Sequence, residues 1–426
     1  IIMIIPMNQY IRSLTLTLSI FIPLTFINVS ESSELSEAKI TLNDLYLFDE
    51  ISSIDVSHSA KQIAYSVSSV DEKKDRYRND IWLLDVNKNK KKVLIKGRPW
   101  VGKTKFSPND TLLGYLAPGR GQYSEYQQIW TINTNYRTKR QLTKLKANIN
   151  DFEWSPDGTQ MILVADSISV DKKTKSSVQT QKPIVIDRYY FKEDGKEFLG
   201  DERQHLHLLD IKSRTTRQLT KGTSNEILPS WSPDSKKIAY VTKTGEMDRT
   251  NNYDVYVLEI DSTNNPIQLT TNLGADSSSS RPQWSPDGKK IAYLHGGDPA
   301  LLWYALQELA VIDLDTKINS ILTKELDRNV SSPQWSDDGQ SIYFVIEDNM
   351  KSQLAKYSLT NQKIKKITPS NYYISGWAKN YVVRNGKIGL ILSNTNSPDE
   401  VYFYDENSLS QQSHHNSELL SSREIL

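Results

Sequence analysis

The strongest constraint on the fold is a short motif that recurs along the whole chain. An aromatic residue is followed by Ser-Pro-Asp-Gly or a close variant, and then by a run of β-branched and aromatic residues. Ser, Pro, Asp and Gly in this order suit a type I turn, so each copy predicts a tight connection between two strands. Five clear copies begin at Phe106, Trp154, Trp231, Trp284 and Trp335, and two worn copies occupy residues 56–60 and 377–380.

The spacing of these copies predicts the size of the repeating unit. From Phe106 onward the intervals are 48, 77, 53, 51 and 42 residues. A four-stranded propeller blade takes about 40 to 50 residues, so only the interval of 77 requires an insertion. Strand-like runs follow each copy, for example residues 237–241 and 255–258, and a Gln-Leu-Thr segment closes several units, as at residues 141–143.

Seven such units predict an all-β fold, a seven-bladed β-propeller of four-stranded antiparallel blades. A closed ring is expected because it leaves no long sheet edge exposed. We expect almost no helix in the ring, and blade boundaries near residues 97, 146, 220, 272, 324 and 369.

Charge and cysteine content exclude several classes of function. The chain has 52 basic and 51 acidic residues, without the basic excess that displaces counterions from a nucleic acid, so no nucleic acid is expected as a partner. It contains no cysteine, which excludes disulfides, thiolate metal sites and a cysteine nucleophile.

The N-terminal region predicts export. Residues 7–12 form a short basic start and residues 13–29 are an uncharged run, the pattern of a secretory signal peptide. The alternative is an uncleaved membrane anchor, for which 17 residues is the short limit. Residues 1–32 are therefore predicted to be a signal peptide or an N-terminal anchor, and the protein is expected in the periplasm.

One segment matches a nucleotide-binding motif by its letters alone. Residues 97–104 read Gly-Arg-Pro-Trp-Val-Gly-Lys-Thr, the phosphate-binding loop pattern. A working loop must open a helix whose N-terminal amides hold phosphate. Residues 105–108 belong to the turn repeat instead, so no helix and no nucleotide are expected.

The histidines and the absence of a nucleophile motif argue against catalysis by this chain. His205 and His207 would face the same side of one strand and could be two metal ligands, but ordinary strand packing is the favoured interpretation because other blades hold Tyr, Trp or Leu there. His414 and His415 are predicted to lie in a solvated linker. No Gly-x-Ser-x-Gly elbow occurs, so no catalytic residue is assigned. The Asp-Gly pairs are explained by turns and lack the alternating carboxylates of a calcium loop, and no metal or cofactor is assigned.

The repeat looks like the TolB-like propeller repeats, which occur in stand-alone periplasmic proteins and in front of serine peptidases. Three further regions resemble the N-terminal propeller of the prolyl oligopeptidase family, in its acylaminoacyl-peptidase and dipeptidyl-peptidase branch. The resemblance covers roughly residues 40–426. The three regions are residues 42–45 with 54–57, the Arg-Tyr-rich residues 187–203, similar to a stretch between blades three and four, and residues 413–420.

The resemblance implies a role without catalysis. That family's Ser, Asp and His lie in an α/β-hydrolase domain after the propeller, and none can be assigned within this sequence, so the chain alone is predicted to be inactive. Residues 40–412 would form a propeller that restricts access of short peptides to that domain, and residues 413–426 would be the linker toward it. The alternative is a stand-alone TolB-like binding module.

The insertion between residues 167 and 203 is the candidate recognition region, since it lengthens the repeat by about 25 residues. Departures from a repeat tend to map to one face and to function. Arg could bind a peptide carboxylate through two hydrogen bonds, and Asp could bind an amine. The alternative is a surface loop followed by an extra hairpin against blade four. The candidate substrate-binding residues are Arg188, Tyr189, Tyr190, Asp194, Asp201 and Arg203.

Overall fold

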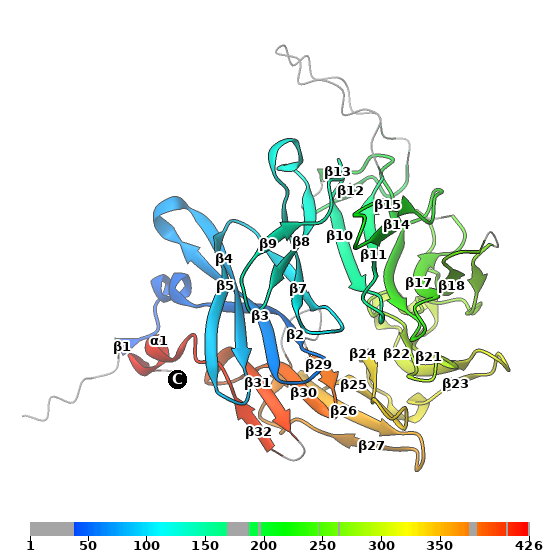
Figure 1. Cartoon of the computed structure of the whole chain (residues 1–426). Helices are drawn as coiled ribbons and strands as arrows, with labels where there is room; N and C mark the ends of the chain where they lie inside the picture. Colours follow the sequence, from blue (N-terminus) through cyan, green and yellow to red (C-terminus); the bar gives the residue numbers. More distant parts are fainter. Residues whose placement is uncertain are drawn as a thin grey trace, which may run out of the picture.

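A computed structural model describes residues 38–167, 186, 188–194, 197–246, 248–262, 265–374, 381–405 and 408–424. The predicted leader, residues 1–32, lies outside these ranges, as do residues 172–181 and the worn motif at 377–380. Seven antiparallel sheets follow one another around a centre in the order of the chain (Figure 1). The predicted seven-bladed propeller is confirmed.

The first four blades each take four strands in the order of the chain, except for an insertion in blade three. They are, in turn, β2 (Glu50–Val56), β3 (Gln62–Asp71), β4 (Arg76–Asp85) and β5 (Lys90–Arg98); β6 (Gly102–Phe106), β7 (Leu112–Pro118), β8 (Gln127–Asn133) and β9 (Lys139–Gln141); β10 (Ile149–Trp154), β11 (Gln160–Asp166), β14 (Gln204–Asp210) and β15 (Thr216–Gln218); and β16 (Glu226–Trp231), β17 (Lys237–Lys243), β18 (Tyr253–Glu259) and β19 (Ile267–Gln268).

The last three blades follow the same order, with a split first strand in blade seven. They are β20 (Gln283–Trp284), β21 (Lys290–Gly296), β22 (Gln307–Asp313) and β23 (Asn319–Ile321); β24 (Val330–Trp335), β25 (Ser341–Asp348), β26 (Lys351–Ser358) and β27 (Lys363–Lys366); and β28 (Tyr373–Ile374) with β29 (Tyr381–Arg384), β30 (Lys387–Asn394), β31 (Ser397–Asp405) and β32 (Ser408–Gln411). Five predicted boundaries fall between blades, and the one near residue 97 falls at the end of β5.

The recurrent motif makes two kinds of contact. Its hydroxyl and carboxylate close the turn: Ser155 Oγ donates to Asp157 Oδ1 at 2.6 Å, which also accepts the Thr159 amide at 2.9 Å. Its aromatic residue joins neighbouring blades, because Trp154 Nε1 donates to the Lys105 carbonyl at 3.1 Å, and Trp231 does the same to Glu153 at 3.2 Å. The motif therefore fixes both the turn and the ring.

The closing Gln-Leu-Thr segment also has a repeated role. Thr220 Oγ1 accepts the Leu206 amide at 2.9 Å, and Gln218 Nε2 donates to the Thr220 carbonyl at 2.8 Å. In blade seven Ser413 takes the place of the threonine and accepts the Val401 amide at 2.7 Å. Equivalent hydroxyl contacts occur at Thr143, Thr270, Thr323 and Thr368.

The ring closes through side-chain packing between blades one and seven. Ile54 and Val56 of β2 share an apolar cluster with Val382 and Ile391 of blade seven. Outside the blades, β1 (Ala38–Lys39) pairs with β33 (Arg423–Glu424), so the two ends of the described chain are held together.

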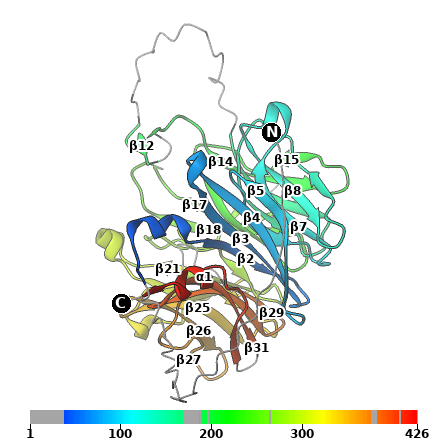
Figure 2. The ribbon, with the colours of Figure 1, turned by 90° about the vertical axis from the view of Figure 1, so that its left-hand side faces the viewer.

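The strand order places both chain ends on one face. The first strand of each blade runs from this face to the opposite one, and four antiparallel strands return the chain to it. We call it the chain-end face, and the face with the Ser-Pro-Asp-Gly turns the turn face. On the chain-end face, the left side in Figure 2, lie the 3-10 helix η1 (Leu42–Leu47), helix α1 (Ser417–Ser421) and the insertion strand β12 (Lys192–Glu193).

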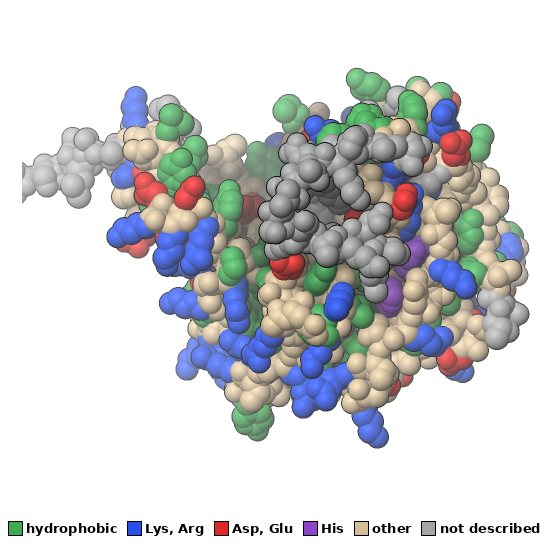
Figure 3. Space-filling view, turned by 90° about the horizontal axis from the view of Figure 1, so that it is seen from above, with side chains coloured by type: hydrophobic (Ala, Val, Ile, Leu, Met, Phe, Trp, Pro, Cys, Tyr) green, Lys and Arg blue, Asp and Glu red, His purple; other side chains and the backbone are tan. Residues whose placement is uncertain are grey.

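The basic and acidic side chains nearly balance in number, but they are not distributed evenly over the surface. Lys and Arg side chains gather toward the left and lower parts of the view in Figure 3, with fewer Asp and Glu among them. Among the residues that the structure describes, no helix is both long and apolar enough to cross a membrane.

Candidate functional site

The first strands of the blades surround a central channel of about 900 Å³, to which all seven blades contribute. β-Bulges interrupt the first strand in blades one, two, three, four and six. Bulges re-aim side chains. Lys103, Leu228 and Ser332 lie at three of them with positive φ values of 36°, 53° and 54°, and all three line the channel.

A charged cluster, here called the channel cluster, spans blades two, three and five. It comprises Lys103, Lys105, Asp151, Glu153 and Arg281. Arg281 Nη2 lies 2.6 Å from Asp151 Oδ2 and 3.3 Å from Glu153 Oε1. The Nζ atoms of Lys103 and Lys105 lie 3.3 and 3.5 Å from that same Glu153 oxygen, and Lys103 also pairs with Asp151.

The channel cluster perturbs the protonation of its own members. Burial lowers the pKa of Lys103 well below its usual value, and the nearby Arg281 lowers it further. Burial alone would raise the pKa of Glu153, but Lys105, Arg281 and Lys103 together hold it well below its usual value. Glu153 therefore stays ionised at neutral pH and acts as a fixed counterion.

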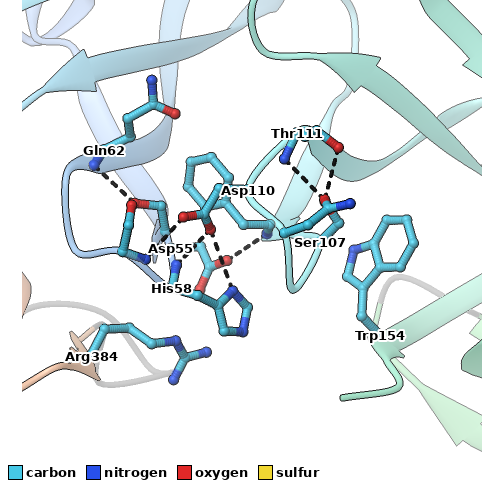
Figure 4. Close-up of polar contacts among 12 residues, drawn as sticks. Asp55, His58, Gln62, Ser107, Asp110, Thr111, Trp154 and Arg384 are labelled. Atoms are coloured by element: carbon cyan, nitrogen blue, oxygen red, sulfur yellow. Dashed lines mark hydrogen bonds and ion pairs between the residues drawn. The ribbon is translucent and has the colours of Figure 1, made fainter. Parts of the chain in front are cut away.

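A second polar group lies at the turn-face end of the channel (Figure 4). Asp110 accepts the backbone amides of His58 at 2.6 Å and Ser59 at 2.9 Å, and Asp55 accepts the Phe106 amide at 2.7 Å. Arg384 of blade seven lies beside His58 and lines the same channel. Burial, and next Arg384, lower the pKa of His58. These contacts tie blades one and two together at the channel mouth.

The insertion lies within blade three, between β11 and β14. This corrects the position between blades three and four suggested by the family resemblance. Its strands β12 and β13 (Glu197–Phe198) form a separate hairpin. The Arg188 guanidinium donates two hydrogen bonds to Asp248, at 2.9 and 2.6 Å, and a third to the Gly200 carbonyl at 2.6 Å. Asp248 lies between β17 and β18, so Arg188 fastens the insertion to blade four.

The other candidate residues lie on the same insertion. Arg203 Nε donates to the Thr223 carbonyl at 2.8 Å. The Arg249 guanidinium lies 5.1 Å from the ring centre of Tyr189, and Tyr189 and Tyr190 are 69% and 51% exposed. Asp194 and Asp201 are also exposed. None of the six candidates, all of which the structure describes, lines the central channel.

The residues of the phosphate-loop pattern form no helix, since Gly97 and Arg98 end β5 and the segment from Gly102 to Thr104 begins β6. Residues from Gly102 onward belong to β6, which runs through the wall of the channel. The lysine of the motif, Lys103, thereby becomes part of the channel cluster. Nothing in the sequence pattern signalled this cluster, because its members come from three blades.

His205 is buried, as ordinary strand packing predicts, but its polar partner belongs to the next blade. Its Nδ1 lies 2.7 Å from Glu226 Oε2, which also accepts the Thr220 hydroxyl at 2.8 Å. Both His205 and Glu226 are buried. In the described part of the chain, no group of three or more His, Cys, Asp or Glu side chains is placed to hold a metal ion.

The prediction of a solvated linker is wrong for His415. Its ring lies edge-on to Tyr65 and Trp82, with centroids 5.6 and 5.0 Å away, and its Nε2 is 3.1 Å from the Tyr65 hydroxyl. Blade one offers an aromatic site that holds this side chain, whereas His414 is exposed. The C-terminal segment is therefore docked on the chain-end face.

We predict that His207 makes stability depend on pH. Burial, with a smaller contribution from His205, lowers the pKa of His207 from 6.5 to about 4. Between these values the unfolded chain binds a proton that the native chain does not, so the free energy of unfolding should fall as pH decreases. The advantage of wild type over His207→Gln should shrink by at most about 1.4 kcal/mol per pH unit from pH 6.5 to 4. Urea unfolding at several pH values measures this difference, and parallel curves for the two proteins would refute the assignment.

Seven four-stranded blades, with both chain ends on one face and a polar channel, define this protein as a seven-bladed β-propeller. No protein-family model matches the sequence. The chain is similar to dipeptidyl-peptidase 5 of Porphyromonas endodontalis, at 25% identity over 390 residues that cover 85% of this chain and 54% of that protein. It is also similar to the uncharacterized peptidase YuxL of Bacillus subtilis, at 25% identity over 224 residues that cover 51% and 34%.

Solved structures show the same fold. Acylaminoacyl peptidase of Pyrococcus horikoshii matches with a TM-score of 0.69 at 14% identity, covering 88% of this chain and 54% of that one. The β-propeller domain of the Trilobed protease from Pyrococcus furiosus matches with a TM-score of 0.61 at 15% identity, covering 87% and 97%. The predicted resemblance to the propellers of these peptidases is confirmed. The matches span between a third and just over half of the two curated relatives.

Proposed function

We propose that this chain is the propeller portion of an exported serine exopeptidase, and that it restricts access of short peptides to an α/β-hydrolase domain. The main support is the similarity to peptidases of which the chain spans only part. The propeller matches 54% of the acylaminoacyl peptidase chain, whereas the match covers 88% of this chain.

The arrangement of the chain-end face is consistent with this role. Arg423 Nη2 lies 2.8 Å from Asp44 Oδ1, and Asn416 exchanges two hydrogen bonds with the backbone of Asp49. These contacts fix where the C-terminal segment leaves the ring. A domain attached through this segment would cover the chain-end face, where the insertion also lies.

Expression of the complete coding region tests the proposal. The encoded protein should cleave acylaminoacyl or dipeptidyl chromogenic substrates and lose activity with a serine-directed inhibitor. The 426-residue chain should show no cleavage, because its sequence contains no Gly-x-Ser-x-Gly nucleophile elbow. A coding region that stops at residue 426 would favour the TolB-like binding module instead. Cell fractionation, with and without residues 1–32, tests export to the periplasm.

Arg188 provides a test of the insertion. In the active full-length protein, Arg188→Ala should raise KM for short peptides roughly three- to tenfold with little change in kcat, because the hairpin would lose its contact with blade four. Asp248→Ala should have the same effect, since it removes the same pair. Arg203→Ala should act in the same direction.

Arg217→Ala is the matched control, because Arg217 is exposed on the outer strand β15. Steady-state kinetics and thermal unfolding are measured on all variants. If Arg188→Ala and Asp248→Ala fold correctly and their kinetic constants are unchanged, the insertion has a structural role and does not affect binding of the peptide.

A further inference from the structure

The channel cluster carries more positive than negative charge. Three cationic side chains, Lys103, Lys105 and Arg281, face two carboxylates, Asp151 and Glu153. All three cations approach one oxygen of Glu153, so that oxygen cannot neutralise them fully. With Lys103 protonated, the cluster has one more cation than it has carboxylates, and the lowered pKa of Lys103 reflects the cost of that buried charge in the absence of a further counterion.

Three buried donors of the described residues that line the channel lack partners, namely Arg281 Nη1, the Ser230 hydroxyl and Arg384 Nε, and so does one acceptor, Asp55 Oδ1. The Nη1 atom of Arg281 is buried and makes no hydrogen bond, although Nη2 of the same guanidinium is paired with Asp151 and Glu153. The Ser230 hydroxyl, which lines the same channel, is buried without a hydrogen-bond partner as well. Buried polar groups are rarely left unsatisfied, so such groups at a cavity indicate a missing ligand or solvent.

The backbone holds the cations in position before any ligand arrives. Lys103 occupies a bulge with φ of 36°, a region that a lysine rarely adopts. Trp154 fixes the carbonyl of Lys105, and Trp231 fixes that of Glu153, through hydrogen bonds of 3.1 and 3.2 Å. Side chains that are preorganised in this way lose little conformational entropy on binding.

We propose that the channel cluster binds the C-terminal carboxylate of a peptide, an inference that takes the peptide as ligand from the proposed function. A carboxylate carries one negative charge, which matches the residual charge of the cluster. Arginine pairs with carboxylates through planar, charge-assisted hydrogen bonds, and Nη1 of Arg281 is free to donate one. A phosphate group, with a charge of about −1.5 to −2 at pH 7, would exceed the residual charge.

The cluster spans most of the length of the first strands. Lys103 and Asp151 lie toward the chain-end face, whereas Lys105 and Glu153 lie near the ends of β6 and β10, toward the turn face. Under the proposed function, removal of N-terminal units requires that a peptide held here by its C-terminus extends its N-terminus toward the chain-end face, where the hydrolase domain would be attached.

Binding of a matched pair of peptides to the 426-residue chain tests the assignment. The probes are N-acetyl tetra-alanine with a free C-terminus and the same peptide with a C-terminal amide. Calorimetry and tryptophan fluorescence report binding, because Trp154, Trp231 and Trp284 line the channel. The free acid should bind at least about tenfold more tightly than the amide, and the difference should shrink as salt is added.

Substitutions locate the site. Arg281→Met should abolish the preference for the free acid, whereas Arg217→Met, on the outer strand β15, should retain it. Since Arg281→Met leaves Asp151 and Glu153 with less counter-charge and could fail to fold, Arg281→Lys and Lys105→Met are measured too. Each should weaken binding of the acid more than binding of the amide, with unchanged circular dichroism.

Several results would overturn the proposal. Equal binding of acid and amide, or a preference that survives in folded Arg281→Lys and Lys105→Met, would show that the cluster does not bind the carboxylate. Acetate or phosphate binding as tightly as the free acid would assign the site to a small free anion. Because these measurements use only the 426-residue chain, they are independent of peptidase activity, so either proposal can fail while the other stands.

Discussion

Replacement of Gly389 by isoleucine should destabilise the propeller by about 3 kcal/mol or more, because it overpacks the contact that closes the ring. Gly389 lies in β30 of blade seven, facing β2 of blade one. A Cβ atom at this position would lie 2.5 Å from Cγ2 of Val56 and 3.3 Å from Cδ1 of Ile54. Both neighbours are buried, so neither can move away without disturbing the shared core.

Chemical denaturation of the 426-residue chain measures this effect. Gly389→Ala should destabilise less than Gly389→Ile, since it adds only the Cβ atom. Gly200→Ala is the control, because a Cβ there would meet no atom within 4 Å and the backbone needs no left-handed conformation. A Gly389→Ile protein as stable as Gly200→Ala would mean that blades one and seven do not pack as described.

The number of blades could be predicted because the motif acts locally. The hydroxyl, carboxylate and amide that close each turn lie within about five residues of one another, as at Ser155, Asp157 and Thr159. Their order in the sequence is therefore enough to identify the turn. The same holds for Gln218 and Thr220, which lie two residues apart.

The channel cluster could not be predicted for the opposite reason. Arg281 pairs with Asp151, which lies 130 positions away in the sequence. The bulge that directs Lys103 into the channel has no recognisable sequence signal. The docking of His415 also depends on distant residues, since Tyr65 is 350 positions away. Contacts of this kind require the closed ring, and the repeat predicts only that the ring exists.

The repeat nevertheless positions the channel cluster indirectly. The tryptophan of four motifs donates a hydrogen bond to the backbone of the preceding blade, on or next to its first strand. Trp154 holds the backbone at Lys105, and Trp231 holds it at Glu153. The contacts that maintain the fold therefore also fix two of the five charged residues, so Trp231→Phe should perturb the channel as well as the ring.

Replacement of His205 by leucine should cost about 3 to 5 kcal/mol of stability, because it leaves a buried carboxylate without its main partner. His205 is 4% exposed and Glu226 is 7% exposed, and their side chains lie 2.7 Å apart between blades three and four. Thr220 would remain as a donor to Glu226, at 2.8 Å, but a hydroxyl alone compensates an ionised carboxylate poorly.

A double-mutant cycle separates this loss from a general effect of substitution. Glu226→Gln should cost only about 1 kcal/mol, since the amide keeps a hydrogen bond to His205. The double variant His205→Leu, Glu226→Gln should be more stable than His205→Leu alone, because no carboxylate is then left in the interior. Urea unfolding at pH 7 measures all four proteins. If the losses in the free energy of unfolding of the two single variants add up to the loss in the double variant, the two side chains do not interact. The histidine would then serve only to fill space between the blades.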